Sequence, residues 1–78
     1  MKRIWLEKQR QNKKMTMLDL ANKLHISESY YFLIENGKRK ANLDLDFARR
    51  LSVALGISLD QVIREEEKMK SEYLYQNC

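Results

Sequence analysis

Apolar residues recur along this chain at helical spacing, in short segments that end at polar residues. Leu20, Ala21 and Leu24 form one apolar stripe, and Tyr31 and Ile34 form a second one shortly afterwards. No run of alternating apolar and polar residues indicates a strand. The pattern therefore predicts an all-α fold, and the separate segments along the chain predict five helices.

The strongest local signals lie between residues 16 and 37. Thr16 is expected to cap a helix, with Asp19 completing a capping box. Ser27 is expected to cap the next helix, which Gly37 can end in a left-handed conformation. Only a short joint separates the two helices, which favours a sharp corner between them. This stretch is therefore predicted to be a helix-turn-helix.

Two further helices flank this unit. The first is predicted over residues 2–12, with Trp5 and Leu6 in the core. The fourth begins at Asn42 or Asp44, because either side chain can cap it. Its inward face is expected to consist of Leu45, Ala48, Leu51 and Leu55.

Gly56 is expected to end the fourth helix, and Ser58 with Gln61 to form a capping box for the fifth. The residues of the fifth helix expected to face the core are Leu59, Val62 and Ile63. This helix is expected to continue further, because Glu66 and Lys70 have the spacing of a helical ion pair.

Length and charge limit the possible functions. A chain of 78 residues with 44% hydrophobic residues suits one small domain and is too apolar for a disordered segment. Residues 1–40 carry ten Lys or Arg against four acids, whereas residues 41–78 carry five against seven. The first half therefore has a net charge of +6 and the second half a net charge of −2. A basic first half suits a polyanionic partner, although a solvated charged surface would have the same balance.

Catalytic chemistry is not indicated. The only histidine, His25, has no Cys or carboxylate at metal-ligand spacing, and Cys78 lacks the electropositive surroundings of a nucleophile. There is no glycine-rich phosphate loop, no bilayer-length apolar run and no signal-peptide pattern. We therefore expect no enzyme, no metal, no cofactor and no membrane partner, and a cytoplasmic location.

Several short motifs occur together in one order: Arg10, Leu20-Ala21, Ile26-Ser27, the run from Ile34 to Gly37 and the run from Leu55 to Leu59. With them, residues 2–63 resemble the phage lambda repressor and Cro family of transcriptional regulators. The resemblance implies a five-helix lambda repressor-like DNA-binding domain over residues 1–63. Residues 64–78 would form a C-terminal helical extension or tail.

The resemblance also implies roles for individual residues. An ion pair between Arg10 and Glu35 would tie the first helix to the third and serve the structure alone. His25 lies where the family usually has glycine, and histidine tolerates the left-handed backbone better than most residues. The recognition helix, residues 28–36, would lie in the major groove of duplex DNA.

The residues expected to read bases are Ser27, Glu28, Ser29, Tyr30, Phe32 and Leu33. Those expected to contact phosphates are Lys13, Lys14, Met17, Asn36, Lys38, Arg39, Lys40 and Asn42. For Lys13 and Lys14 an alternative is open, because cations just past a helix also interact favourably with its dipole.

Two departures from the family pattern favour an alternative partner. Met17 stands where the family usually has a glutamine that bonds phosphate, and the recognition helix carries Glu28 and several aromatic residues. The main hypothesis is a small regulator, a repressor, that binds specific DNA sites and resembles those of phages, plasmids and other mobile elements. The alternative is a protein-binding helix-turn-helix module, an antirepressor or adaptor, that uses this acidic and aromatic face.

A DNA-binding unit of this kind is expected to act as a homodimer on a two-fold site. The apolar residues expected to form the dimer interface are Val62, Met69, Tyr73 and Leu74. The alternative for this C-terminal stretch is a frayed end that contacts nothing.

Overall fold

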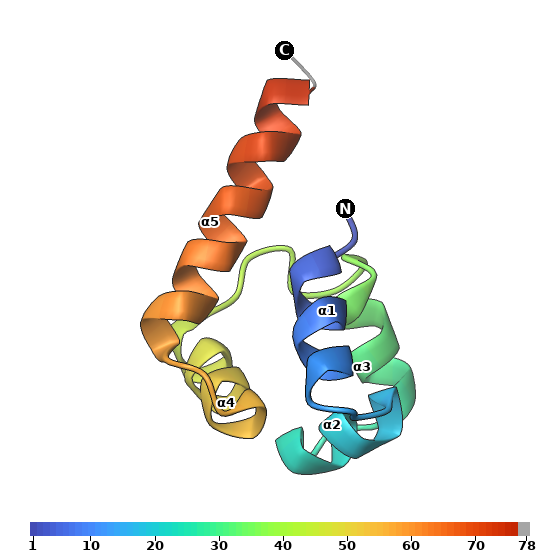
Figure 1. Ribbon diagram of the computed structural model, residues 1–78. Coiled ribbons are helices and arrows are strands. Elements are labelled where there is room, and N and C mark those ends of the chain that lie inside the picture. Colours follow the sequence, from blue (N-terminus) through green and yellow to red (C-terminus); the bar gives the residue numbers. More distant parts are fainter. Residues whose placement is uncertain (77–78) are drawn as a thin grey trace.

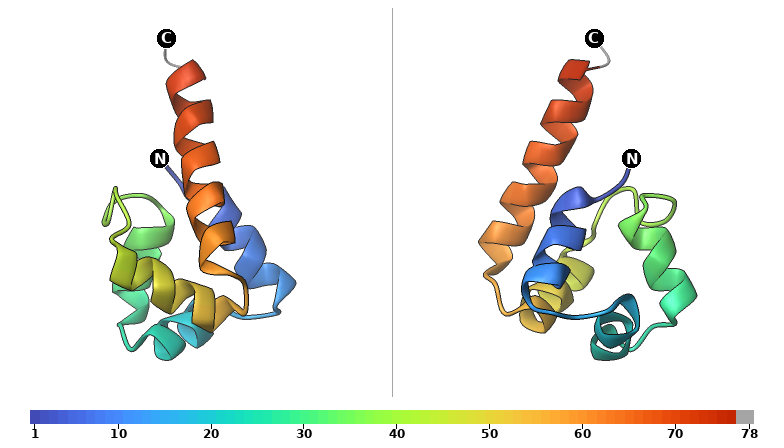
Figure 2. Two further views of the ribbon diagram at one scale, coloured as in Figure 1. Left: turned by 90° about the vertical axis from the view of Figure 1, so that its left-hand side faces the viewer. Right: turned by 45° about the vertical axis from the view of Figure 1, so that its right-hand side comes forward.

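The computed structural model describes the backbone of residues 1–76 and the side chains of residues 1–72. Within residues 1–76 the chain forms five α-helices and no strand, as predicted: α1 (Ile4–Asn12), α2 (Met17–Leu24), α3 (Glu28–Glu35), α4 (Leu45–Leu55) and α5 (Leu59–Gln76). The first four helices and the start of α5 pack into one body, and the rest of α5 projects from it (Figures 1 and 2). The dimensions are 38 × 25 × 23 Å.

The corner between α2 and α3 forms as predicted. The Asp19 N–H donates to Thr16 Oγ1 at 3.1 Å, and the Thr16 N–H donates to Asp19 Oδ2 at 2.9 Å, which completes the capping box. Ser27 Oγ accepts from the Tyr30 N–H at 3.1 Å and caps α3. Between them, His25 ends α2 in the left-handed conformation, at φ +59°. These caps fix the point at which α3 begins.

The end of α3 is fixed by a glycine. Gly37 has φ +74°, its N–H donates to the Ile34 carbonyl at 3.1 Å, and the Lys38 N–H donates to the Leu33 carbonyl at 2.8 Å. This pair of bonds is a Schellman motif. A Cβ atom at position 37 would lie 1.7 Å from the Met1 carbonyl oxygen. Both the backbone angle and the N-terminal segment against it therefore require glycine.

The core gathers the apolar stripes of all five helices. Its buried apolar residues are Trp5, Leu6, Leu20, Ala21, Leu24, Tyr31, Ile34, Phe47, Ala48, Leu51, Leu55 and Val62. Helices of eight or nine residues such as α1, α2 and α3 are too short to be stable alone, so this packing holds them in place.

Two predicted core residues, Leu45 and Ile63, are instead exposed, at 60% and 38%. Asp44 caps α4 by accepting from the Phe47 N–H at 2.7 Å, so Leu45 lies in the first turn, outside the buried stripe, and Phe47 is buried in its place. In α5 the inward residues follow Val62 at a spacing of four and then three, a pattern that excludes Ile63.

The Arg10–Glu35 pair is present between α1 and α3. Arg10 Nε donates to Glu35 Oε1 at 3.0 Å, Arg10 Nη1 donates to the Met15 carbonyl at 2.9 Å, and the Tyr31 hydroxyl donates to Glu35 Oε1 at 2.8 Å. Burial and then the bond to Glu35 raise the pKa of Tyr31. Burial alone would lower the pKa of Arg10, but the bond to Glu35 and its charge raise it overall.

A second buried ion pair, Arg3–Glu66, was not predicted. Arg3 Nε donates to Glu66 Oε1 at 2.7 Å, and the Trp5 indole N–H donates to the same oxygen at 2.9 Å. Arg3 precedes α1, which begins at Ile4 and not at Lys2. The predicted Glu66–Lys70 ion pair is wrong, because the Glu66 carboxylate is buried and accepts from Arg3 and Trp5 instead.

Candidate nucleic-acid interface

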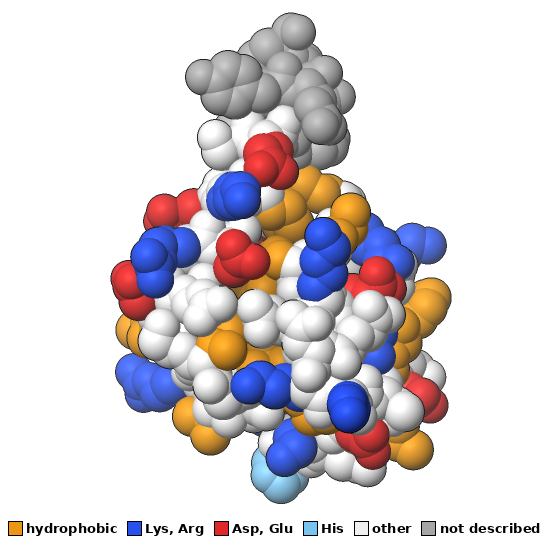
Figure 3. All heavy atoms as spheres, in the orientation of Figure 1, with side chains coloured by type: hydrophobic (Ala, Val, Ile, Leu, Met, Phe, Trp, Pro, Cys, Tyr) orange, Lys and Arg blue, Asp and Glu red, His pale blue; other side chains and the backbone are white. Residues whose placement is uncertain are grey.

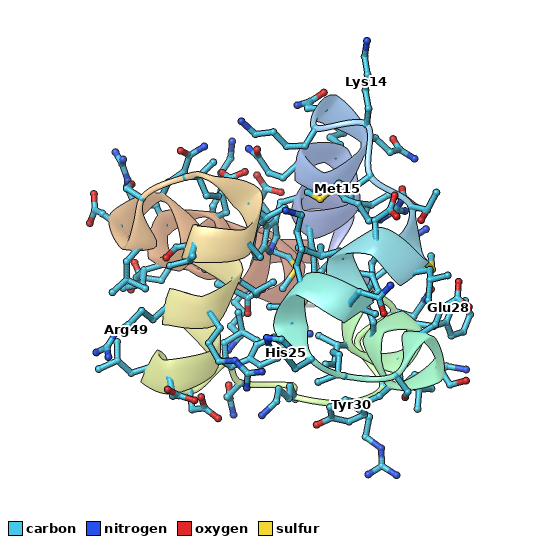
Figure 4. The ribbon with its side chains drawn as sticks, turned by 90° about the horizontal axis from the view of Figure 1, so that it is seen from below. Lys14, Met15, His25, Glu28, Tyr30 and Arg49 are labelled. Carbon is cyan, nitrogen blue, oxygen red and sulfur yellow. The ribbon has the colours of Figure 1, made fainter. Side chains whose placement is uncertain are left out.

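The predicted recognition helix, α3, is exposed along one side. Ser27, Glu28 and Ser29 are exposed, and the Phe32 side chain is 47% exposed. Glu28 forms no ion pair with any residue whose side chain is described, and Figure 4 shows it at the edge of the molecule. Tyr30 differs from these residues, because it is half-buried and packs against the core. Part of the Tyr30 ring is therefore buried and cannot contact bases.

An open hollow of about 390 Å³ lies between the start of α2 and the exposed side of α3. Met17 comes from α2, and the other lining residues come from α3: Glu28, Ser29, Phe32 and Leu33. Four of the six predicted base-reading residues thus line one hollow together with Met17, which had been expected to contact phosphate. The surface is apolar with one carboxylate beside it.

The basic loop after α3 is tied to the domain at several points. Lys40 Nζ lies 3.3 Å from Asp44 Oδ2 and 5.0 Å from the centre of the Phe47 ring. Lys38 and Arg39 are exposed and form no ion pair within residues 1–72. Of the three cations expected to contact phosphates, these two are the ones that a polyanion can engage without breaking an internal bond.

The two predicted asparagines have internal partners. Asn36 Nδ2 donates to the Phe32 carbonyl at 2.9 Å, at the end of α3. Asn42 Oδ1 accepts from Lys70 Nζ at 2.6 Å, so the loop is attached to α5. Each side chain retains a further polar atom, the Asn36 oxygen and the Asn42 amide nitrogen, for a ligand.

The corner between α1 and α2 carries the remaining predicted cations. Lys13 and Lys14 are exposed, and Lys14 has φ +56° and points away from the molecule in Figure 4. Met17, which follows this corner, lies beside the start of α3, whereas the basic loop follows the end of α3. The candidate phosphate contacts therefore flank the candidate base-reading residues.

A cationic hollow of about 450 Å³ was missed by sequence reasoning. Lys23 and His25 line it from the end of α2, and Arg49 and Arg50 line it from α4, above a floor of Val53 and Ala54. Arg50 Nη2 donates to the Leu24 carbonyl and holds the two helices together. The Arg49-Arg50 pair was visible in the sequence, but only the packing of α4 on α2 brings it to His25.

Charge is otherwise mixed over the surface. In the orientation of Figure 1, Lys and Arg side chains are spread over the visible face with Asp and Glu between them (Figure 3). None of the helices in residues 1–76 is long and apolar enough to cross a membrane. Among the described residues, no three His, Cys, Asp or Glu side chains come together as metal ligands.

The predicted dimer contacts need a correction. Val62 is fully buried in the core and cannot reach a second chain. Met69 is half-buried and lines a groove between α1 and α5, beside the exposed Ile4. The side chains of Tyr73 and Leu74 lie outside the described residues.

A model of the helix-turn-helix family matches residues 6–62 of the chain. The match includes the capped corner between α2 and α3 and almost the whole apolar core. No curated protein and no solved structure matches the chain.

Proposed function

Because the chain belongs to the helix-turn-helix family of lambda repressor/Cro-type DNA-binding regulators, we propose that it represses transcription by binding specific sites on duplex DNA through α3. One observation supports α3 most directly: Glu28, Ser29 and Phe32 are exposed on it, while the buried Glu35 anchors its end. A helix held in this way can enter the major groove with its N-terminal residues toward the base edges.

We assign residues to bases or to phosphates by the exposure of their side chains. Glu28, Ser29 and Phe32 address bases, whereas Lys38 and Arg39 contact phosphates and set the position of the domain without reading sequence. We further propose that two chains bind a two-fold site, with half-sites about 34 Å apart, one helical turn of DNA. The groove between α1 and α5, where Ile4 and Met69 lie among charged residues, is the surface that we propose meets the second chain.

The test begins with selection of binding sites from a random duplex pool, using the full chain. Affinity for the selected site is then measured at several salt concentrations. Replacing Lys38 and Arg39 with alanine should reduce the log–log salt slope by up to about 1.8 for each bound chain, because each lost phosphate contact accounts for about 0.9. The order of preference among sequences should not change.

A matched control removes two cations elsewhere. Arg49 lies exposed on α4, and Arg64 lies on α5, where its Nε is 3.3 Å from Asp60 Oδ2. Alanine at both positions should leave the salt slope unchanged. Equal slopes for the loop variant and the parent would contradict the proposed orientation on DNA.

A second candidate function is a protein-binding module that uses the same surface. The observation that favours it is the exposed Phe32 beside the unpaired Glu28, because an acidic apolar face is unusual opposite a polyanion. Failure to enrich any sequence from the pool would favour this module over the repressor.

A further inference from the structure

The hollow between α2 and α3 combines two chemical properties on the surface that is proposed to face DNA. Met17, Phe32 and Leu33 give it an apolar wall, and Glu28 and Ser29 supply its polar groups. Glu28 is exposed and has no cationic partner among residues 1–72. A carboxylate in this position is repelled by phosphates, so it favours binding only where it receives a hydrogen bond.

The major groove offers few groups that match such a surface. Its hydrogen-bond donors are the exocyclic amino groups of cytosine and adenine, and its apolar group is the 5-methyl group of thymine. Guanine presents only acceptors there, which a carboxylate repels. The carboxylate of Glu28 and the apolar wall beside it therefore match a base amino group next to a pyrimidine 5-methyl group.

The size of the hollow suits this match. A water molecule takes up about 30 Å³ in the liquid, so a hollow of about 390 Å³ can receive a methyl group together with the edge of its base. Met17 contributes to the wall from a position on α2, and Phe32 from one turn into α3 past Glu28. The apolar wall and the carboxylate are thus presented side by side.

We propose that this hollow makes DNA binding sensitive to base methylation: it receives a pyrimidine 5-methyl group while Glu28 accepts a hydrogen bond from an adjacent base amino group. The inference rests on the proposed DNA binding and specifies what α3 reads. The methyl group has two sources. It belongs either to a thymine or to 5-methylcytosine, which carries the methyl and amino groups on one ring.

The experiment uses the full chain and the duplex selected from the random pool, with affinity measured by fluorescence anisotropy. In one arm each thymine is replaced in turn by deoxyuridine, which removes the methyl group alone. In the other arm each cytosine is replaced by 5-methylcytosine. If the methyl group comes from thymine, one deoxyuridine in one half-site weakens binding about fourfold, the effect of leaving one methyl-sized group unburied. If it comes from 5-methylcytosine, methylation strengthens binding by a similar factor.

Three variants connect the effect to the hollow. Met17→Gln keeps the length of the side chain but makes the wall polar, and Phe32→Ala removes the largest part of it. Both should bind the methylated and unmethylated duplexes equally. Leu18→Gln is the control, because Leu18 is 48% exposed on α2 and does not line the hollow. That variant should retain the full difference.

Glu28→Ala tests the amino group, because alanine has no side-chain acceptor for its hydrogen bond. Selection with this variant should lose the preference for cytosine or adenine next to the methyl group. The proposal is overturned if the chain binds its selected site but neither arm changes affinity, or if Met17→Gln retains the methyl effect. A chain that enriches no DNA sequence would instead refute the proposed function, and this inference with it.

Discussion

Removal of the Glu66 carboxylate is expected to destabilise the fold more than any exposed substitution. Glu66 is 7% exposed and Arg3 is 1% exposed, so neither charge has water to solvate it. Without the carboxylate, the Arg3 guanidinium remains buried with only carbonyl partners: that of Ile34, at 2.7 Å, and those of Arg39, Lys40 and Ala41. The Trp5 indole N–H loses its acceptor as well.

The magnitude follows from the burial of the remaining charge. Breaking a buried ion pair from one side costs about 3–5 kcal/mol of unfolding free energy. A domain of this size has a total stability toward the lower end of about 5–15 kcal/mol. At about 4–8 °C per kcal/mol, Glu66→Ala should lower the melting temperature by at least about 12 °C.

The natural probe is Trp5, the only tryptophan, which hydrogen-bonds to Glu66. Urea titration followed by fluorescence, and thermal melting followed by circular dichroism, would measure the loss. The control is Glu67→Ala, because Glu67 is the exposed neighbour, and it should stay within about 0.5 kcal/mol of the parent.

A double variant, Arg3→Met with Glu66→Leu, tests the cause. It should recover part of the loss, because an apolar pair needs no solvation. It should not recover all of it, because the Trp5 indole N–H still lacks its acceptor and the Ile34 carbonyl keeps only its bond from the Gly37 N–H. If Glu66→Ala is as stable as Glu67→Ala, the pair does not hold α1 to α5 and the reasoning is refuted.

Two further predictions concern pH and assembly. The hydrogen bond from the Phe47 N–H, and then Lys40, lower the pKa of Asp44 below its usual 3.8. The ionised carboxylate therefore stabilises the fold above pH 3.8, and this stability is lost as the pH falls through 3.8 and on through the folded-state pKa. Asp44→Asn should melt at a lower temperature than the parent near pH 7, and the difference in melting temperature should shrink as the pH falls below about 3.8. A chain ending at Lys68 lacks Met69, which lines the groove proposed to meet a second chain, and it should fold but run as a monomer in sedimentation and bind a two-fold site more weakly; a monomeric full chain with unchanged affinity after truncation would show that the projecting end of α5 plays no part.

Local signals in the sequence were sufficient to predict the corner between α2 and α3, which positions the candidate DNA interface. Thr16, Ser27 and Gly37 act on backbone groups within a few residues, so their roles can be read without knowing the tertiary contacts. The left-handed backbone of His25 was expected from the resemblance instead, because the family usually has glycine at that position. The beginning of α4 remained open between Asn42 and Asp44 because both side chains can cap, and the choice of Asp44 moved Leu45 out of the core.

The Arg3–Glu66 pair could not be predicted from neighbouring residues, because 63 positions separate its members. Three consecutive acids at residues 65–67 have the appearance of a solvated surface. One signal was available, since Glu66 follows Val62 by four positions and precedes Met69 by three, which places it within the apolar stripe of α5. A charged residue at such a position indicates a buried partner, but the sequence does not say which one.

The two buried ion pairs act on the same end of α3. Arg10 holds the Glu35 side chain, while Arg3 binds the Ile34 carbonyl and its own N–H donates to the Glu35 carbonyl at 2.8 Å. At the other end of α3, Glu28 and Ser29 are exposed. Substitutions of these two residues should change stability by no more than about 0.5 kcal/mol. The orientation of the recognition helix is thus set at one end, and the residues proposed to read DNA can vary at the other without cost to the fold.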